Sequence, residues 1–200
     1  MPILSRAACP ALAAFLAAIA APLAAQHDDH AHGTSAAAAT DIARLGRVEF
    51  ANSGAPAAQP AVQRGMTLLH SFLFDEARIA FLEAQAADPG FALAYWGEMV
   101  SAGDSAAADS ILRRLGRTPA ERAAKAPTER ERGYLAIAER FLLSTSDDDS
   151  VAVAFADAWR ALHERYPDDD DATLFYALSL VSRRYAERAD ADRSLRTAVE

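Results

Sequence analysis

The segment after the first 25 residues combines histidines and aspartates, which are possible metal ligands. Three histidines and two aspartates lie within six residues: His27, Asp28, Asp29, His30 and His32. Imidazole and carboxylate groups together suit Zn²⁺, Cu²⁺ or Ni²⁺. Residues 26–44 carry no helical stripe, and most of them are polar or small, which predicts a disordered linker. Weak metal capture by His27, His30 and His32 is the alternative to a solvated linker.

His70 is a second candidate for chemistry, within the stretch LLHSF at 68–72. Ser71 follows it directly, but neighbouring helix residues point about 100° apart, so the two do not form a Ser–His dyad. The sequence has no nucleophile elbow, phosphate loop, zinc-protease motif or dinucleotide fingerprint. We therefore expect no enzymatic activity and no cofactor. For His70, packing against a neighbouring helix is favoured over contact with a partner.

Residues 1–25 have the three-part plan of a secretory signal peptide. Arg6 precedes an apolar run from Ala11 to Ala21, and small residues end the segment at Ala25. The run is too short and too rich in alanine for a spanning helix, which needs about 20 apolar residues. We expect cleavage near Ala25, a periplasmic or secreted location, and no stable membrane span afterwards. Because Cys9 is the only cysteine, the mature chain would have no disulfide.

The composition favours an all-α protein. Of the 200 residues 52% are hydrophobic, and alanine, arginine, glutamate and leucine outweigh the β-branched residues. The net charge is −8 and the basic residues are scattered, so nucleic acid is not an expected partner. We expect one helical domain over residues 45–200.

Apolar residues recur at helical spacing through most of this domain. The spacing and the breakers predict helices over 59–73, from 75 to the turn Asp88-Pro89-Gly90, and over 91–102, 129–143, 149–165 and 172–185, with another beyond. Thr118 with Glu121, and Thr128 with Glu131, each fit a capping box at a helix start.

Two further groups have a plain structural interpretation. Tyr95 and Trp96 form an aromatic pair that we expect to be buried between helices. The acidic runs 147–149 and 168–171 lack the glycine and the ligand spacing of a calcium loop. Both runs precede expected helices, where carboxylates are favoured by the exposed amides, so we interpret them as helix caps.

One 34-residue window matches the tetratricopeptide repeat, in which two antiparallel helices pack closely. If Ala58 is counted as position 1, the pattern's positions 8, 20, 24, 27 and 32 are Gly65, Ala77, Phe81, Ala84 and Pro89. Small residues at Gly65 and Ala77 let the helices approach, Phe81 fills the space beside them, and Pro89 ends the hairpin. Ala61 and Arg64 depart from the pattern, as terminal repeats often do.

The stretches GMTLLHSFLFDEARIAFLEAQAADPGFALAYWGEM, APTERERGYLAIAERF and RYPDDDDATLFYALSL occur in this order. Over about residues 47–182 the chain resembles a family of exported bacterial tetratricopeptide-repeat proteins with an LHSF…AYWG first repeat. The resemblance implies an α-solenoid and supplies no catalytic residues. Members of the family usually continue with more repeats, so we expect the chain to be truncated at its C-terminus.

In tetratricopeptide repeats the first helix lines a concave groove through positions 2, 5, 6, 9, 12 and 13. Here these positions are Gln59, Val62, Gln63, Met66, Leu69 and His70. A mixed polar and apolar groove suits an extended peptide or a partner helix. The sequence therefore predicts a non-enzymatic helical scaffold that binds a protein or peptide partner in the bacterial envelope. Divalent-metal capture by the His/Asp tail on a helical scaffold is the alternative.

Metal capture has a geometric condition. Cleavage after Ala24 would make His27 the third residue, where the terminal amine, two amides and the imidazole enclose Cu²⁺ or Ni²⁺ in a square plane. Cleavage after Ala25 would make His27 the second residue, and this geometry is lost.

If the tail captures metal, titration of the mature protein with Cu²⁺, Ni²⁺ and Zn²⁺ releases heat that a protein lacking residues 26–33 does not release. Isothermal calorimetry measures this difference, and N-terminal sequencing of the mature protein identifies the cleavage site. Equal heats from the two proteins would leave the segment as a linker.

Overall fold

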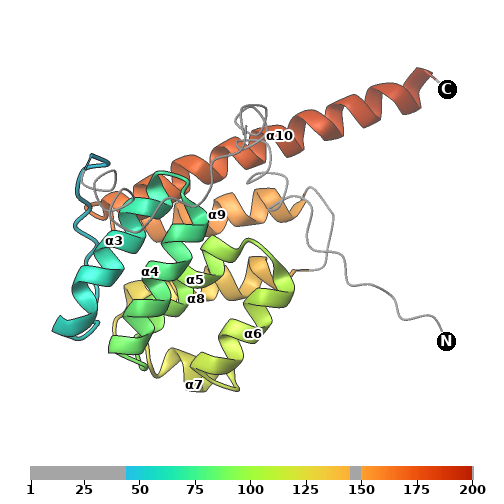
Figure 1. Ribbon diagram of the computed structural model, residues 1–200. Coiled ribbons are helices and arrows are strands. Elements are labelled where there is room, and N and C mark those ends of the chain that lie inside the picture. Colours follow the sequence, from blue (N-terminus) through green and yellow to red (C-terminus); the bar gives the residue numbers. More distant parts are fainter. Residues whose placement is uncertain (1–43, 145–149, 200) are drawn as a thin grey trace, which may run out of the picture.

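The computed structural model describes residues 44–144 and 150–199, and all the regular structure in these ranges is helical (Figure 1). The elements in chain order are the 3₁₀ helix η2 (Pro56–Ala58) and the α-helices α3 (Gln59–His70), α4 (Phe74–Ala87), α5 (Ala92–Ala102), α6 (Ser105–Leu115), α7 (Pro119–Ala123), α8 (Glu129–Leu142), α9 (Ser150–Arg165) and α10 (Asp170–Val199). The predicted all-α class is confirmed for the described residues.

The helix starts follow the capping signals in the sequence. Thr128 accepts a hydrogen bond from the Glu131 amide, and the Glu131 carboxylate accepts one from the Thr128 amide, so the predicted capping box of α8 is confirmed. Thr118 caps α7 in the same way, but the Glu121 carboxylate accepts from the amide of Arg117 instead. Only half of the capping box predicted at Thr118 therefore forms.

Two features differ from the expected helices. Helix α6 was not expected; it begins after Asp104, whose carboxylate accepts hydrogen bonds from two amides of the first turn, and it buries Ile111, Leu112 and Leu115. Helix α10 runs without a break from Asp170 to Val199, beyond the expected end at 185. No glycine or proline lies in that stretch, so nothing local ends the helix.

The first three α-helices pack in chain order around one phenylalanine. α3 packs on α4 and α4 packs on α5, as short connections between antiparallel helices require. Phe81 of α4 is fully buried between Gly65 of α3 and Gly97 of α5. A Cβ atom at Gly65 would lie 2.9 Å from Phe81 Cε1, and one at Gly97 would lie 2.3 Å from it. Both glycines therefore permit a helix approach that alanine would prevent.

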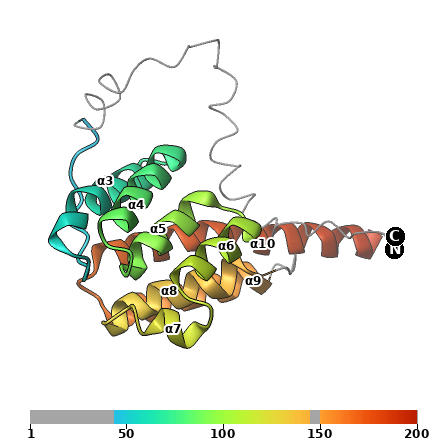
Figure 2. The same cartoon turned by 60° about the horizontal axis from the view of Figure 1, so that its bottom comes forward.

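Helices α8, α9 and α10 meet α5 at an aromatic cluster. Phe175 of α10 contacts the rings of Trp96 on α5, Tyr134 on α8 and Trp159 on α9, with ring centroids 5.3, 6.3 and 4.9 Å away. Figure 2 shows α10 crossing behind α5, and in both views its C-terminal half extends beyond the other helices. The N-terminal half of α10 is thus a core element.

None of the helices in the described ranges has the length and apolar character required to cross a lipid bilayer.

Replacing Gly97 by alanine should lower the free energy of unfolding by up to about 2 kcal/mol. Overpacking a core costs about 1–3 kcal/mol, which outweighs the gain of about 1 kcal/mol that alanine brings to a helix. Urea unfolding followed by circular dichroism measures the change. Gly90→Ala, where the nearest atom to the added Cβ is 3.5 Å away, is the control and should change stability by less than about 0.5 kcal/mol. Equal effects would show that Phe81 adjusts freely.

Candidate binding site

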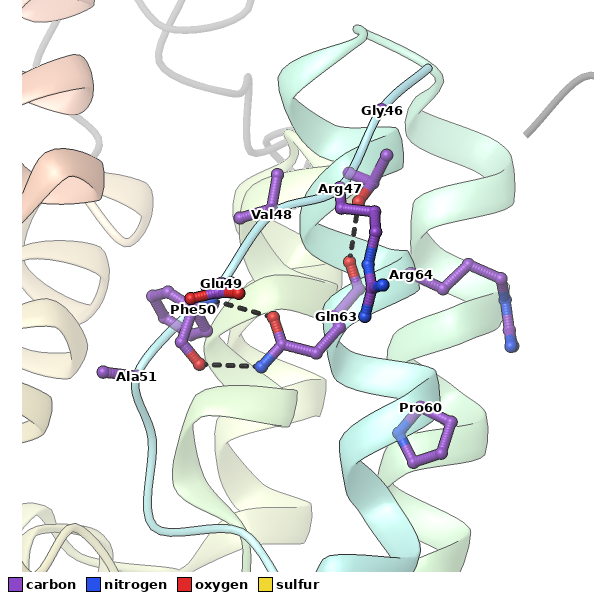
Figure 3. Close-up of a pocket in the computed structure, with 10 residues that line it drawn as sticks. Gly46, Arg47, Val48, Glu49, Phe50, Ala51, Pro60, Gln63 and Arg64 are labelled. Atoms are coloured by element: carbon purple, nitrogen blue, oxygen red, sulfur yellow. Dashed lines mark hydrogen bonds between the residues drawn. The ribbon is translucent and has the colours of Figure 1, made fainter. Parts of the chain in front are cut away.

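The six predicted groove residues all lie on α3, but most of their surface is covered. Val62, Met66 and Leu69 are buried in the same core cluster as Phe50. Gln59, Gln63 and His70 are partly exposed. The chain's own segment 46–55, which precedes the first helix, lies along this face of α3 (Figure 3).

Gln63 holds the backbone of this segment by both of its amide groups. The Phe50 amide donates to Gln63 Oε1 at 2.8 Å, and Gln63 Nε2 donates to the Phe50 carbonyl at 2.9 Å (Figure 3). A side-chain amide that pairs with both the N–H and the C=O of one residue recognises an extended chain without regard to its side chains. The primary amide of Gln63 therefore pairs with the backbone of Phe50 as a neighbouring β-strand would.

Side chains from three further places hold the segment beyond Phe50. Arg130 Nη1 donates to the Ala51 carbonyl at 2.6 Å, and the Ser53 amide donates to Glu131 Oε1 at 2.7 Å. Gln59 Nε2 donates to the Gly54 carbonyl at 2.7 Å, and the Ala55 amide donates to Asp88 Oδ2 at 2.9 Å. These donors and acceptors belong to α3, to α8 and to the end of α4. The segment is thus bound mainly through its backbone.

Two residues of the segment, Phe50 and Gly54, are tightly packed against the helices. The Phe50 ring is 1% exposed, stacks on Trp96 and meets Tyr134 edge-on, with centroids 6.0 and 5.9 Å away. The Arg130 guanidinium lies 5.0 Å from the centre of the same ring. At Gly54 a Cβ would lie 2.6 Å from a Phe91 ring atom, so a side chain does not fit there. The surroundings thus accommodate an aromatic ring at position 50 and leave no room for a side chain at position 54.

His70 points to a different part of the molecule. Its Nε2 lies 2.8 Å from Asp171 Oδ1 on α10, where the carboxylate accepts the hydrogen bond, and both side chains are largely buried. Its ring centroid is 5.6 Å from that of Phe175. The structure thus places His70 against a neighbouring helix, one that starts a hundred residues later in the sequence.

A buried ion pair fixes the start of α10 to α8. Arg130 donates to both carboxylate oxygens of Asp169, at 2.5 and 2.9 Å, and the Tyr134 hydroxyl donates to Asp169 Oδ2 at 3.0 Å. Burial raises the pKa of Asp169, but the hydrogen bonds and the charge of Arg130 outweigh burial and leave that pKa below its ordinary value. Burial also raises the pKa of Tyr134 far above its usual value, so the hydroxyl stays protonated and donates.

The sequence also predicted that Tyr95 and Trp96 are buried and that the acidic runs cap helices. Trp96 is fully buried and Tyr95 is 7% exposed, so the expected burial of this pair is confirmed. In the run 168–171, Asp169 caps α10 by accepting from the Ala172 amide at 3.3 Å. The run does more than cap, because Asp169 and Asp171 also bind Arg130 and His70. The run 147–149 lies outside the described residues.

The predicted metal ligands His27, His30 and His32 and the predicted signal peptide lie outside the described residues. Within the described ranges, no group of three or more histidine, cysteine, aspartate or glutamate side chains is arranged to hold a metal ion.

The predicted groove residues Gln59 and Gln63 contact the chain's own segment, which the sequence did not predict. Phe50 stands in a polar stretch, where a single aromatic residue gives no periodic signal. Arg130, Glu131 and Asp88 were interpreted as parts of a helix start and a turn. Only the fold brings them to the backbone of residues 51–55.

No protein-family description matches the chain, and neither a curated protein nor a solved structure matches it.

Asp169→Asn should lower the free energy of unfolding at neutral pH by about 3 kcal/mol, because loss of one partner of a buried ion pair leaves Arg130 unpaired. The pKa of Asp169 is lower in the folded state than in the unfolded state, so its stabilising contribution is full above the unfolded value of about 3.9 and is lost as the pH falls through the folded value. The difference between the two proteins should therefore shrink below about pH 4.

Urea unfolding over a series of pH values measures this difference. Asp168→Asn alters an exposed neighbour and is the matched control, with an expected change below about 0.5 kcal/mol. A difference between wild type and Asp169→Asn that stays constant down to acid pH would contradict the role of the charge.

Proposed function

We propose that this protein is a non-enzymatic helical-repeat scaffold that binds a protein or peptide partner in the bacterial envelope. The partner contributes an extended segment that takes the place of residues 46–55. The observation that carries the proposal is the way this segment is held: side chains of α3 and α8 bind its backbone, and one aromatic ring is buried. Backbone contacts supply affinity for extended peptides, and the pocket supplies selectivity.

A tetratricopeptide-like repeat over residues 58–91 fits this function. The close packing of Gly65 on Phe81, together with the buried Ala77 and Ala84, supports such a hairpin. In this arrangement the first helix of the hairpin, α3, presents Gln59 and Gln63 to the ligand. Repeat proteins commonly bind extended partners on surfaces built from such helices.

The chain's own segment competes with the partner. A short tether gives it an effective concentration of the order of millimolar, so a partner binds only in proportion to the time that the groove is open. A change that weakens the docking of the segment should therefore strengthen the binding of a peptide from solution. The preferred peptide carries an aromatic residue and, four residues later, a glycine, as Phe50 and Gly54 do.

The full-length Phe50→Ala protein should bind a fluorescent peptide with the sequence of residues 46–55 at least about tenfold more tightly than the wild type does, because its own segment no longer fills the aromatic pocket. Fluorescence anisotropy measures the affinity, and circular dichroism checks that the helices persist. If Phe50→Ala does not fold, Phe50→Leu serves the same purpose with a smaller loss of buried area.

Three controls define the binding mode. Peptides with the alanine change at the position of Phe50, or at that of Gly54, should not bind. Adding Gln63→Leu to the Phe50→Ala protein should abolish binding, whereas Arg64→Gln should not, since Arg64 pairs with Glu83 and points away from the segment (Figure 3). Failure of both Phe50 variants to bind the peptide, with their helices intact, would show that the groove holds residues 46–55 only as part of the fold.

A further inference from the structure

Helices α9 and α10 form the last hairpin of the described residues, and this hairpin is attached unevenly to the other helices. α10 packs extensively on α9, and α9 packs on α8. The packing of α10 on α3, α5 and α8 is much less extensive. A part of a domain with few packing contacts opens locally at a lower free energy than the core does. The docking of α10 on these three helices therefore depends on individual side chains near its start.

Two buried carboxylates at the start of α10 make polar contacts with helices outside the hairpin. Asp169 accepts from Arg130 of α8 at 2.5 and 2.9 Å, and Asp171 accepts from His70 of α3 at 2.8 Å. Separation of α10 from α3 and α8 breaks both contacts. A change elsewhere that weakens either contact therefore makes this opening of α10 easier.

The ring of Phe50 packs on the same two aromatic side chains that hold α10. Phe175 of α10 meets Trp96 and Tyr134 edge-on, with ring centroids 5.3 and 6.3 Å away. Phe50 of the segment 46–55 contacts the same two rings, with centroids 6.0 and 5.9 Å away. Removal of Phe50 leaves space beside both rings, and protein cores lose stability when a buried ring leaves such a space. The contacts of Phe175 therefore weaken when the segment leaves.

Arg130 provides a polar connection between the segment and α10. Its guanidinium donates to the Ala51 carbonyl at 2.6 Å and lies 5.0 Å from the centre of the Phe50 ring, while it also binds Asp169. Departure of the segment removes these two neighbours and opens the guanidinium to water. An ion pair weakens when water reaches it, because the effective dielectric constant rises. Loss of the segment therefore weakens the bond between Arg130 and Asp169.

We propose that the docking of the segment 46–55 and the docking of the hairpin α9–α10 are energetically coupled. An occupied groove holds the start of α10 in place, and an empty groove loosens it. For a partner the inference rests on the proposed function: exchange of the chain's own segment for a partner's passes through an empty groove, and thus through a loosened α10. Coupling between two sites is reciprocal, so a docked α10 also strengthens binding in the groove.

Hydrogen exchange followed by mass spectrometry tests the coupling in the full-length chain. Phe50→Ala should raise the exchange rate of the amides of residues 172–182 in α10 at least about tenfold more than that of residues 77–84 in α4, because coupling between sites is typically about 5–150-fold. The amides of α4 report opening of the whole domain. If Phe50→Ala does not fold, Phe50→Leu takes its place. Equal increases in α4 and α10 would overturn the coupling.

Leu112→Ala is the matched control for the exchange measurement. It removes a buried side chain from α6 and leaves the contacts of Phe50, Arg130 and Phe175 in place. Its effect should therefore be no larger in α10 than in α4. A preferential increase in α10, as large as that caused by Phe50→Ala, would show that α10 responds to any loss of stability and would also overturn the proposal.

The reverse direction is tested by peptide binding to the Phe50→Ala protein. Adding His70→Leu removes the donor to Asp171 and should weaken binding of the peptide 46–55 about tenfold, because His70 bonds to α10 and its change loosens that helix. His163→Leu is the matched control, since His163 Nδ1 lies 3.0 Å from Thr173 Oγ1 within the hairpin. It should leave the peptide affinity unchanged. Fluorescence anisotropy measures both affinities.

The two measurements separate this proposal from the proposed function. If the Phe50→Ala protein does not bind the peptide, the proposed function fails, and the exchange rates of α10 and α4, which need no peptide, still decide the coupling. If the peptide binds, a saturating amount should restore slow exchange in α10. A peptide affinity that His70→Leu leaves unchanged would overturn the coupling, because reciprocity requires an effect in both directions.

Discussion

The side chain of Tyr134 joins segments that lie far apart in the sequence. Its ring contacts those of Phe50, Trp96, Trp159 and Phe175, with centroid distances between 5.1 and 6.3 Å. Its hydroxyl donates to Asp169 and is fully buried with the ring. Because burial raises the pKa of Tyr134 above its ordinary value, the hydroxyl is protonated at neutral pH and donates to Asp169. Tyr134 of α8 thus contacts the segment 46–55, α5, α9 and α10.

Arg130, one helical turn before Tyr134, connects the same elements by charge. It neutralises the buried Asp169 at the start of α10, donates to the Ala51 carbonyl in the N-terminal segment and lies over the ring of Phe50. A buried carboxylate without such a partner would be costly. The groove and the start of α10 are therefore held by one guanidinium. The buried ring of Trp96 is likewise shared, since it contacts Phe50 of the segment and Phe175 of α10.

The parts of the fold that could be predicted depend on nearby residues. The cap of α8 joins residues three apart, and the close packing of Gly65 against Phe81 belongs to one hairpin, so both were visible in the sequence. Helix α6 was missed although Asp104 marks its start, because its apolar stripe is short. The sequence analysis predicted a helix end at 185, but α10 continues to Val199 because neither glycine nor proline breaks that stretch.

The sequence by itself determined the helical class and most helix starts, because periodicity, caps and breakers act over a few positions. The tertiary structure decided what these residues meet. His70 binds Asp171 across 101 residues, Glu131 binds the Ser53 amide across 78, and Phe50 enters a pocket made by α5 and α8. Such contacts depend on how whole helices pack against one another. The residues that make them show no local sequence pattern from which the partner could be predicted.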